Sequence, residues 1–177
     1  MSIREIRVNP FVFMTLGEAQ LLGASVLAQV RPFCVVAEIA GSTRREKPDG
    51  LKDVEIVAVP RSLHLFELAH VVNREWGRPS EGKFPSKYTR LRGAVNLDLF
   101  WCTPETFGLV FFIRTGSDEF AQSALARWKQ LTGGGYSECA RLHSAAGVVQ
   151  DTPDEAAVFR LLQLDFIPPK LRNGRLP

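Results

Sequence analysis

Two acidic residues at the start of one predicted strand are the part of the sequence best suited to chemistry. Residues 53 to 59 read Asp-Val-Glu-Ile-Val-Ala-Val, an apolar run that carries Asp53 and Glu55. Because side chains alternate between the two faces of a strand, both carboxylates point to the same side. Neighbouring carboxylates repel each other and lose hydration, a cost that a cation between them offsets. The pair therefore predicts a cation site.

A glycine-serine turn precedes this acid pair. An apolar strand is predicted over residues 33 to 40, and it breaks at Gly41-Ser42, before the basic residues Arg44 and Arg45. A turn of this kind binds anions through its backbone N–H groups. Next to a carboxylate pair, it predicts a site for a metal-bound phosphate.

A third acid, Asp98, lies inside another apolar strand, predicted over residues 93 to 102. An acid in the middle of an apolar strand needs a partner or a metal. If this strand pairs with the earlier one, Asp53, Glu55 and Asp98 converge on one face of a sheet. Three oxygen donors in an open site suit Mg²⁺, which takes its remaining ligands from water and from substrate phosphates.

The elements that must position these residues follow from periodicity and from helix start signals. Thr15 and Glu18 form a capping box ahead of a helix that ends at Arg31-Pro32. Thr103 and Thr152, each followed by proline and an acid, are predicted to be N-caps. Further helices are predicted over residues 61–76, 103–114, 117–131 and 152–162, a basic strand over 87–92, a loop over 77–86, short strands or loops over 136–150, and an extended tail over 167–172.

This order of elements predicts a mixed α/β fold of the α+β type. A small sheet carries acids at its middle, and a subdomain boundary falls near Thr115-Gly116. At 177 residues the chain is long enough for one good-sized core or for two small subdomains that share an interface.

Composition narrows the class of protein. A hydrophobic content of 45%, a charged content of 23% and a net charge of +3 are ordinary for a soluble globular protein. The three cysteines lie far apart in the sequence without metal-ligand spacing, which argues against a disulfide framework or a structural zinc site. No signal peptide and no apolar run of membrane-spanning length is apparent, so a cytoplasmic monomer without membrane contact is expected.

Four ordered motifs give the chain a resemblance to a known family. Gly41-Ser42, a spacer and Asp53-Val54-Glu55 resemble the nucleotidyltransferase signature. More narrowly, Gly-Ser-Thr-Arg-Arg at residues 41–45 resembles the Gly-Ser-x-Arg-Arg motif of family X DNA polymerases, the group that includes DNA polymerase beta. Thr-Gly-Ser at residues 115–117 and Ile-Pro-Pro-Lys-Leu-Arg at residues 167–172 resemble their later motifs.

The resemblance implies a fold and an activity. Residues 1–114 would form a palm, which is a nucleotidyltransferase-type mixed sheet flanked by helices, and residues 115–177 a small C-terminal α/β subdomain that binds nucleotide and template. The implied reaction is repair or gap-filling synthesis, in which a primer 3′-hydroxyl attacks a nucleoside triphosphate and pyrophosphate leaves. Primer-template or gapped DNA would be the partner. The chain resembles the compact viral members, so no lyase activity is expected.

The resemblance also implies site residues. Asp53, Glu55 and Asp98 would be catalytic and would bind two Mg²⁺ ions, with Mn²⁺ as a substitute. Ser42 and Arg45, helped by the backbone of Gly41, would hold the β and γ phosphates. Thr115, Gly116, Ser117 and Asp118 would form the turn beneath the sugar and base, and Arg44, Lys87, Arg90 and Arg92 would contact DNA.

The chain departs from the family pattern at three places. Glu55 stands where these polymerases usually have Asp, and Ile113-Arg114 where they often have aromatic residues that meet the sugar. Ala121 and Leu125 replace the usual base-contacting Asn and Arg. These departures leave sugar selection and templating open.

Three alternatives remain open from the sequence. One is a template-independent nucleotidyltransferase that acts on RNA, a protein or a small molecule. Another is a nucleic-acid-binding module with a decayed site. The third is that Asp53 and Glu55 are a solvated strand edge, and the basic residues ordinary surface charge.

Overall fold

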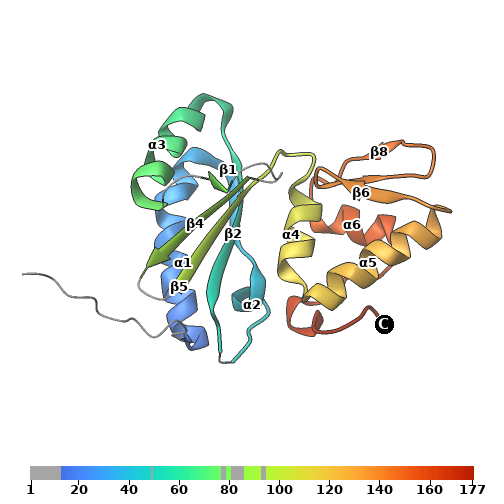
Figure 1. The fold of residues 1–177 in the computed structure, drawn as a ribbon, viewed down its shortest axis with the longest axis horizontal. Helices are drawn as coiled ribbons and strands as arrows, with labels where there is room; N and C mark the ends of the chain where they lie inside the picture. Colours follow the sequence, from blue (N-terminus) through green and yellow to red (C-terminus); the bar gives the residue numbers. More distant parts are fainter. Residues whose placement is uncertain (1–12, 49, 77–78, 81–85, 93–94) are drawn as a thin grey trace, which may run out of the picture.

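Two β-sheets and six α-helices make up the described part of the chain (Figure 1). The computed structural model describes residues 13–48, 50–76, 79–80, 86–92 and 95–177. The larger sheet has, in spatial order, β1 (Cys34–Ile39), β2 (Asp53–Pro60), β5 (Val95–Trp101), β4 (Ser86–Arg92) and β3 (Pro79–Ser80). Only the β2–β5 pair is parallel among its pairings, so the sheet is mixed. The predicted α+β class is confirmed.

One face of the large sheet is covered by α1 (Leu16–Val30) and α3 (Leu65–Trp76) (Figure 1). The predicted capping box starts α1: the Thr15 side chain accepts from the Glu18 N–H, and the Glu18 carboxylate accepts from the Thr15 N–H at 2.8 Å. The apolar side of α1 packs with the leucines, valines and isoleucines of β2 and β5 that face away from the acids.

The other face of the same strands carries the acids and then a second apolar patch. Beyond Glu55, the residues Val57 and Val59 point to this side and pack with Phe100 against α4 (Phe107–Thr115). The short helix α2 (Gly41–Arg44) lies on this side as well (Figure 1). Strand β2 therefore supplies both Asp53 and Glu55 and the two valines that contact α4.

A separate core holds the C-terminal part together. It forms where α4 packs against α5 (Asp118–Leu131) and α6 (Glu155–Leu161). A three-stranded antiparallel sheet lies beside these helices, with strands β6 (Tyr136–Glu138), β7 (Arg141–His143) and β8 (Val149–Gln150). Because α4 contributes Leu109 and Phe112 to this core and Val110 and Phe111 to the sheet-side core, it links the two parts.

Two predicted helix starts are wrong. The N-cap position of α4 is Thr106 and not Thr103, so the helix starts at Phe107, three residues later than predicted. Thr103 instead begins a turn, in which its carbonyl accepts from the Thr106 N–H. The N-cap of α6 is Asp154, whose carboxylate accepts from the Ala157 N–H at 2.7 Å, instead of Thr152. In each case the proline that follows the threonine lies in the turn that leads into the helix.

Thr152 caps a different helix from the one its sequence position suggests. Its carbonyl accepts from the Gly108 N–H at 2.7 Å, and its hydroxyl accepts from the Leu109 N–H at 3.3 Å. These are two of the first-turn N–H groups that α4 cannot satisfy internally, and Thr106 provides no side-chain cap. Thr152 is fully buried, so this contact joins the start of α6 to the start of α4.

Three further predictions needed correction. The helix predicted over residues 61–76 is a 3₁₀ turn, η2 (Ser62–His64), followed by α3. The loop predicted over residues 77–86 contains the short strand β3, which pairs with β4, and its other residues before Ser86 lie outside the described part. The tail predicted to be extended contains the 3₁₀ turn η3 (Pro169–Leu171).

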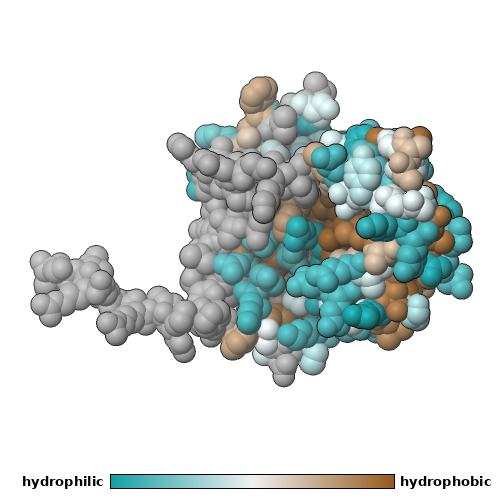
Figure 2. Space-filling view, turned by 45° about the vertical axis from the view of Figure 1, so that its right-hand side comes forward, coloured by the Kyte–Doolittle hydropathy of each residue, from teal (hydrophilic) through white to brown (hydrophobic). Residues whose placement is uncertain are grey.

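The surface mixes polar and apolar side chains. Figure 2 shows hydrophilic residues over much of the C-terminal part, with hydrophobic ones between them. Singly exposed apolar residues such as Phe166 and Leu171 are normal for a folded protein. In the described part of the chain, no helix combines the length and apolar character needed to cross a bilayer.

The contact between Thr152 and α4 predicts a measurable loss of stability. Thr152→Val keeps the shape of the side chain but leaves the Leu109 N–H unsatisfied. We expect the free energy of unfolding to fall by about 1–2 kcal/mol, measured by urea denaturation. Thr152→Ser keeps the hydroxyl and is the control. An equal loss in both variants would show that the hydroxyl has no capping role.

Candidate functional site

The three predicted acids lie on one face of the large sheet, on the paired strands β2 and β5. These strands are parallel, and their register sets Glu55 opposite Asp98 and Asp53 opposite Asn96. Residues directly opposite each other in paired strands share a face, so the three carboxylates belong to one side. Asp98 is buried, and the other two are half-buried. We call Asp53, Glu55 and Asp98 the acid row.

The side chains of the acid row are not already gathered around one point. Among the residues that the structure describes, no three His, Cys, Asp or Glu side chains form a group that could hold a metal ion together. The fit to Mg²⁺ therefore rests on the donor chemistry and the shared face, because three carboxylates supply the hard oxygen ligands that this ion prefers. Rotation of the side chains would have to bring their oxygens together.

Glu55 lies directly against the turn that follows β1. The Ala40 N–H donates to the Glu55 carbonyl at 2.8 Å, and Gly41 has a φ of 66°. A Cβ added at Gly41 would meet the Glu55 carboxylate, which would have to turn aside, and would stand 3.3 Å from the Glu55 Cβ. The left-handed backbone favours glycine here, and any larger residue would displace the Glu55 carboxylate.

The predicted Gly-Ser turn is the first part of α2, a single helical turn. It places Ser42 half-buried and Arg44 and Arg45 at its end. The two neighbouring arginines have different surroundings.

Arg45 reaches from α2 to two neutral acceptors. Its Nη1 donates to the Thr115 carbonyl at 2.6 Å, and its Nε donates to Asn173 Oδ1 at 3.1 Å. Burial lowers the pKa of Arg45, and the negative charges of Glu55, Asp53 and Asp118 oppose that change. The guanidinium is thus close enough to the acid row to be stabilised by its charge.

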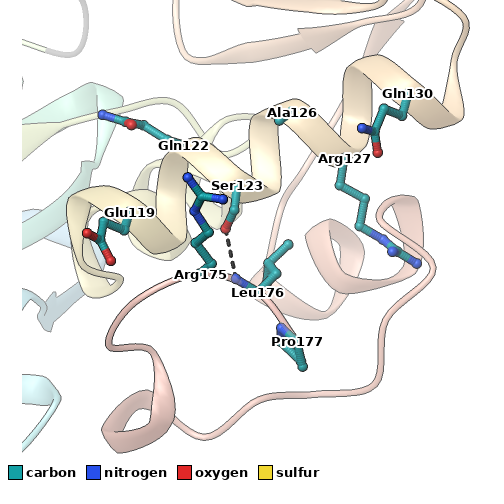
Figure 3. Close-up of a pocket in the computed structure, with 9 residues that line it drawn as sticks. All are labelled: Glu119, Gln122, Ser123, Ala126, Arg127, Gln130, Arg175, Leu176 and Pro177. Atoms are coloured by element: carbon teal, nitrogen blue, oxygen red, sulfur yellow. Dashed lines mark hydrogen bonds between the residues drawn. The ribbon is translucent and has the colours of Figure 1, made fainter.

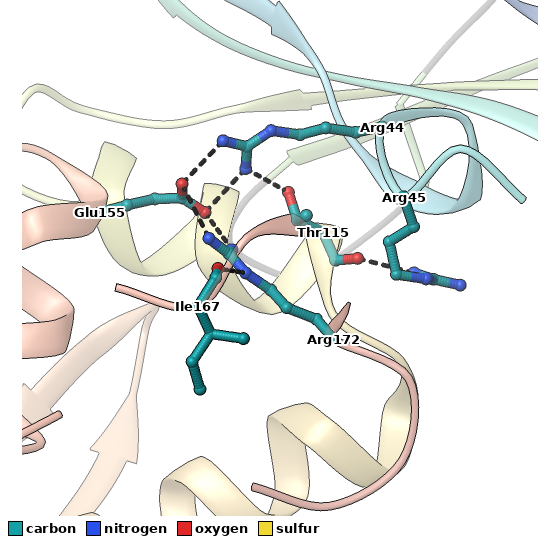
Figure 4. Close-up of polar contacts among 6 residues, drawn as sticks. All are labelled: Arg44, Arg45, Thr115, Glu155, Ile167 and Arg172. Atoms are coloured by element: carbon teal, nitrogen blue, oxygen red, sulfur yellow. Dashed lines mark hydrogen bonds and ion pairs between the residues drawn. The ribbon is translucent and has the colours of Figure 1, made fainter. Parts of the chain in front are cut away.

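Arg44 is committed to an internal ion cluster, which we call the Arg–Glu–Arg cluster (Arg44, Glu155 and Arg172). Arg44 binds the Glu155 carboxylate with two hydrogen bonds of 2.8 Å and donates to Thr115 Oγ1 at 2.8 Å (Figure 4). Its guanidinium also stacks on the Phe111 ring, 3.8 Å from the centroid. Its predicted DNA contact stays a prediction, and these contacts favour a structural role.

Arg172 completes the Arg–Glu–Arg cluster from the other side. Its Nη1 lies 2.5 Å from Glu155 Oε1, its Nε donates to the Ile167 carbonyl at 2.8 Å, and its side chain is fully buried (Figure 4). Burial raises the pKa of Glu155, but the hydrogen bonds and charges of both arginines outweigh it and lower the pKa below the usual 4.5. The carboxylate is therefore ionised at neutral pH.

In the sequence, Arg172 closes the motif at residues 167–172 with no role assigned, and Glu155 lies in the helix predicted over residues 152–162 with no role assigned either. The available signal was an acid followed by three apolar residues in the first turn of the helix, a position that also suits the helix dipole. Only tertiary structure shows that Glu155 is buried and takes two arginines.

The predicted turn at residues 115–118 joins α4 to α5. Ser117 is the N-cap of α5, as predicted, and its hydroxyl accepts from the Phe120 N–H at 3.2 Å. A Cβ on Gly116 would stand 2.6 Å from the Phe120 ring, so a small residue is needed there. Asp118 is exposed at the first position of α5 and contributes to the charge around Arg45.

Arg114, on the last turn of α4, was noted in the sequence only as a departure from the family pattern. Its guanidinium lies over the Phe100 ring at 4.1 Å from the centroid. Phe100 is two residues beyond Asp98 on the same strand face, so Arg114 is a further cation next to the acid row.

The remaining predicted DNA contacts lie on β4. The backbone of Lys87 pairs with Phe100, that of Arg90 with Leu97 and that of Arg92 with Val95. The side chains of these three basic residues lie outside the described part, so their role stays a prediction.

The cysteines play no part in the site. Burial raises the pKa of Cys34 to about 11 and that of Cys102 to about 12, so both are protonated at neutral pH. Cys139 is exposed on the turn between β6 and β7.

Comparison with protein-family models finds no family that matches this chain, and comparison with curated proteins finds no matching relative.

The lowered pKa of Glu155 predicts how stability depends on pH. Glu155→Gln breaks a buried pair, and we expect it to lower the free energy of unfolding by about 3 kcal/mol at pH 7. Because the folded pKa is below the unfolded value of 4.5, this contribution is complete above pH 4.5 and is lost as the pH falls through the folded pKa. Denaturation of both proteins from pH 7 to pH 3 checks this, and a gap that stays constant would contradict it.

The contact between Gly41 and Glu55 predicts a difference between two glycine substitutions. Gly50 has almost the same φ as Gly41, 65° against 66°, but a Cβ there would meet nothing closer than 3.8 Å. Gly50→Ala should cost only the backbone strain of about 1–2 kcal/mol. Gly41→Ala should cost clearly more in urea denaturation, and equal losses would contradict the carboxylate contact.

Proposed function

We propose that the protein is a metal-dependent nucleotidyltransferase, and more narrowly a small template-directed DNA polymerase of family X type. The observation that carries this proposal is the parallel register of β2 and β5, which sets Glu55 opposite Asp98 with Asp53 one pair along. A row of three carboxylates beside an arginine that makes no ion pair among the described residues suits a metal-bound polyphosphate. The larger sheet would be the palm.

Asp53, Glu55 and Asp98 would hold two Mg²⁺ ions. When bound, such ions activate an attacking hydroxyl and stabilise the leaving pyrophosphate in an in-line displacement. The glutamate is one methylene longer than the usual aspartate, and its carboxylate lies against Gly41. Rotation of this longer side chain would bring its oxygens toward a metal ion beside Asp53 and Asp98.

The chain's own cations would bind the nucleotide. Among the described residues, the two contacts of Arg45 use Nε and one donor of Nη1, and a guanidinium presents its other donors in a geometry that matches phosphate oxygens. Ser42, half-buried on the same turn, would add a hydroxyl. The turn from Thr115 to Asp118 would lie beneath the sugar and base.

In this proposal the Arg–Glu–Arg cluster has a positioning role. It attaches α2, which carries Arg45, to α6 and to the C-terminal segment. The palm would span residues 1–114 and the nucleotide- and template-binding subdomain residues 115–177, with primer-template or gapped DNA as partner. Basic residues on β4 would meet its phosphates.

A second candidate is a template-independent nucleotidyltransferase. It is favoured by α5, where Ala121 is buried and Leu125 packs against the C-terminal core. Neither residue offers a polar group to a base pair. The same acid row would then serve transfer to a nucleic acid end or another acceptor without a template.

Loss of the central acid tests for an active enzyme. Asp98→Asn should lower incorporation of deoxynucleotides on gapped DNA by at least about 100-fold, because charge on the metal-binding face stabilises the transition state. DNA binding, measured by fluorescence anisotropy, should remain. Asp165→Asn, at an exposed acid of the C-terminal part, is the control. Unchanged incorporation by Asp98→Asn would contradict the role of Asp98 as a metal ligand, and no incorporation even by the unaltered protein would support the binding module with a decayed site.

Primer extension separates the two enzyme candidates. The template-directed proposal expects incorporation that follows the template base on gapped DNA and needs Mg²⁺. Extension of blunt or single-stranded ends at the same rate, whatever the template, would instead support the template-independent enzyme.

A further inference from the structure

The C-terminal tail, residues 173–177, is fastened along α5 and reaches the arginine next to the acid row. The Leu176 N–H donates to Ser123 Oγ at 2.9 Å (Figure 3). The Gly174 N–H donates to Ser117 Oγ at 3.0 Å. The Arg172 carbonyl just before the tail accepts from the Ser117 N–H at 3.0 Å. The tail is therefore held by the first turns of the helix that follows the predicted nucleotide turn.

Asn173, the first residue of the tail, has an amide whose two ends are both engaged. Its Nδ2 donates to the Lys170 carbonyl at 2.9 Å, and its Oδ1 accepts from Arg45 Nε at 3.1 Å. The contact to the Lys170 carbonyl needs the NH₂ end of the amide, so it directs the oxygen to Arg45. The orientation of this side chain is thus set by the 3₁₀ turn that precedes it.

The two acceptors together fix the plane of the Arg45 guanidinium. The Thr115 carbonyl accepts from Nη1 and Asn173 Oδ1 accepts from Nε, so within the described part of the chain the donors of Nη2 and the second donor of Nη1 take no acceptor. Because the charges of Glu55, Asp53 and Asp118 act on this guanidinium, it lies close to the face where a metal-bound phosphate would lie. A guanidinium tied at two edges loses less freedom when it binds phosphate.

We propose that Asn173 is a positioning residue for nucleotide binding, which holds Arg45 in the orientation that receives the triphosphate. This proposal rests on the proposed function, since it assigns a second role at the same site. The tail would thereby link the phosphate contact at Arg45 to the sugar-side turn, because Ser117 receives hydrogen bonds from both α5 and the tail.

The test is Asn173→Ala in steady-state incorporation on gapped DNA. Loss of one hydrogen bond to a charged group should raise KM for the nucleotide about five- to tenfold and leave kcat within about twofold. Affinity for inorganic tripolyphosphate with Mg²⁺, measured by calorimetry, should fall by a similar factor. Asn173→Gln keeps both ends of the amide and should restore part of the affinity. Gln130→Ala, an exposed amide at the far end of α5, is the control.

A double-mutant cycle separates positioning from general packing. Lysine has no counterpart of Nε, so Asn173→Ala should add little to the KM change of Arg45→Lys. Additive effects of the two changes, or an Asn173→Ala variant with unchanged KM and tripolyphosphate affinity, would overturn the inference. If the unaltered protein neither incorporates nucleotide nor binds tripolyphosphate, the proposed function and this inference both fail. If the unaltered protein incorporates nucleotide and binds tripolyphosphate, the result for Asn173→Ala tests the inference alone.

Discussion

The attachment of the part that contains the large sheet to the C-terminal part depends on the ionised carboxylate of Glu155. A buried charge is strongly unfavourable unless it is paired and hydrogen-bonded, and here both partners come from elsewhere in the chain. Arg44 arrives from the helix after β1, and Arg172 from the segment after η3. Aromatic rings surround the cations, with Phe111 under Arg44 and Phe159 at 5.0 Å from Arg172, so part of their lost hydration is replaced. All three segments must be in place before the buried carboxylate has both of its cationic partners.

This ion cluster and the candidate site share one residue, Thr115. Arg44 donates a hydrogen bond to the Thr115 hydroxyl oxygen, and Arg45 donates one to the Thr115 carbonyl. Two consecutive arginines therefore bind the same residue, one at its side chain and the other at its backbone. Thr115 is fully buried at the end of α4, where its position is set by the core on either side of that helix. Displacement of α4 would therefore disturb the ion cluster and the orientation of Arg45 together.

Much of the fold follows from local sequence signals, whereas the contacts that attach distant segments do not. The capping box at Thr15, the alternation of β2 and the N-cap at Ser117 depend on neighbours in sequence, and each was predicted correctly. Thr152 misled because its cap-like sequence is real but serves α4, more than forty residues earlier in the chain. A hydroxyl can satisfy any unpaired N–H within reach, and sequence alone does not say which helix start lies there.

In the candidate site, too, the local features could be predicted from the sequence and the contacts between distant segments could not. The period of a strand was enough to place Asp53 and Glu55 on one side, and the pairing of β2 with β5 then added Asp98. Sequence could not tell which of two adjacent arginines is internal, because both are equally basic and lie on the same short helical turn. That distinction depends on Glu155, which comes from α6, and on Asn173, which comes from the tail.

Arg44 and Arg45 differ in whether a carboxylate or a neutral oxygen holds the guanidinium. Arg44 is paired with the Glu155 carboxylate at 2.8 Å, which it shares with Arg172, so its guanidinium is engaged in an internal ion pair. Arg45 is held by a carbonyl and an amide oxygen, and in the described part of the chain it makes no ion pair. Neutral acceptors fix a guanidinium without cancelling its charge, while the acid row nearby favours its protonated form. The arrangement therefore keeps an oriented positive charge beside three carboxylates, which is what binding an anion together with a metal ion at one place requires.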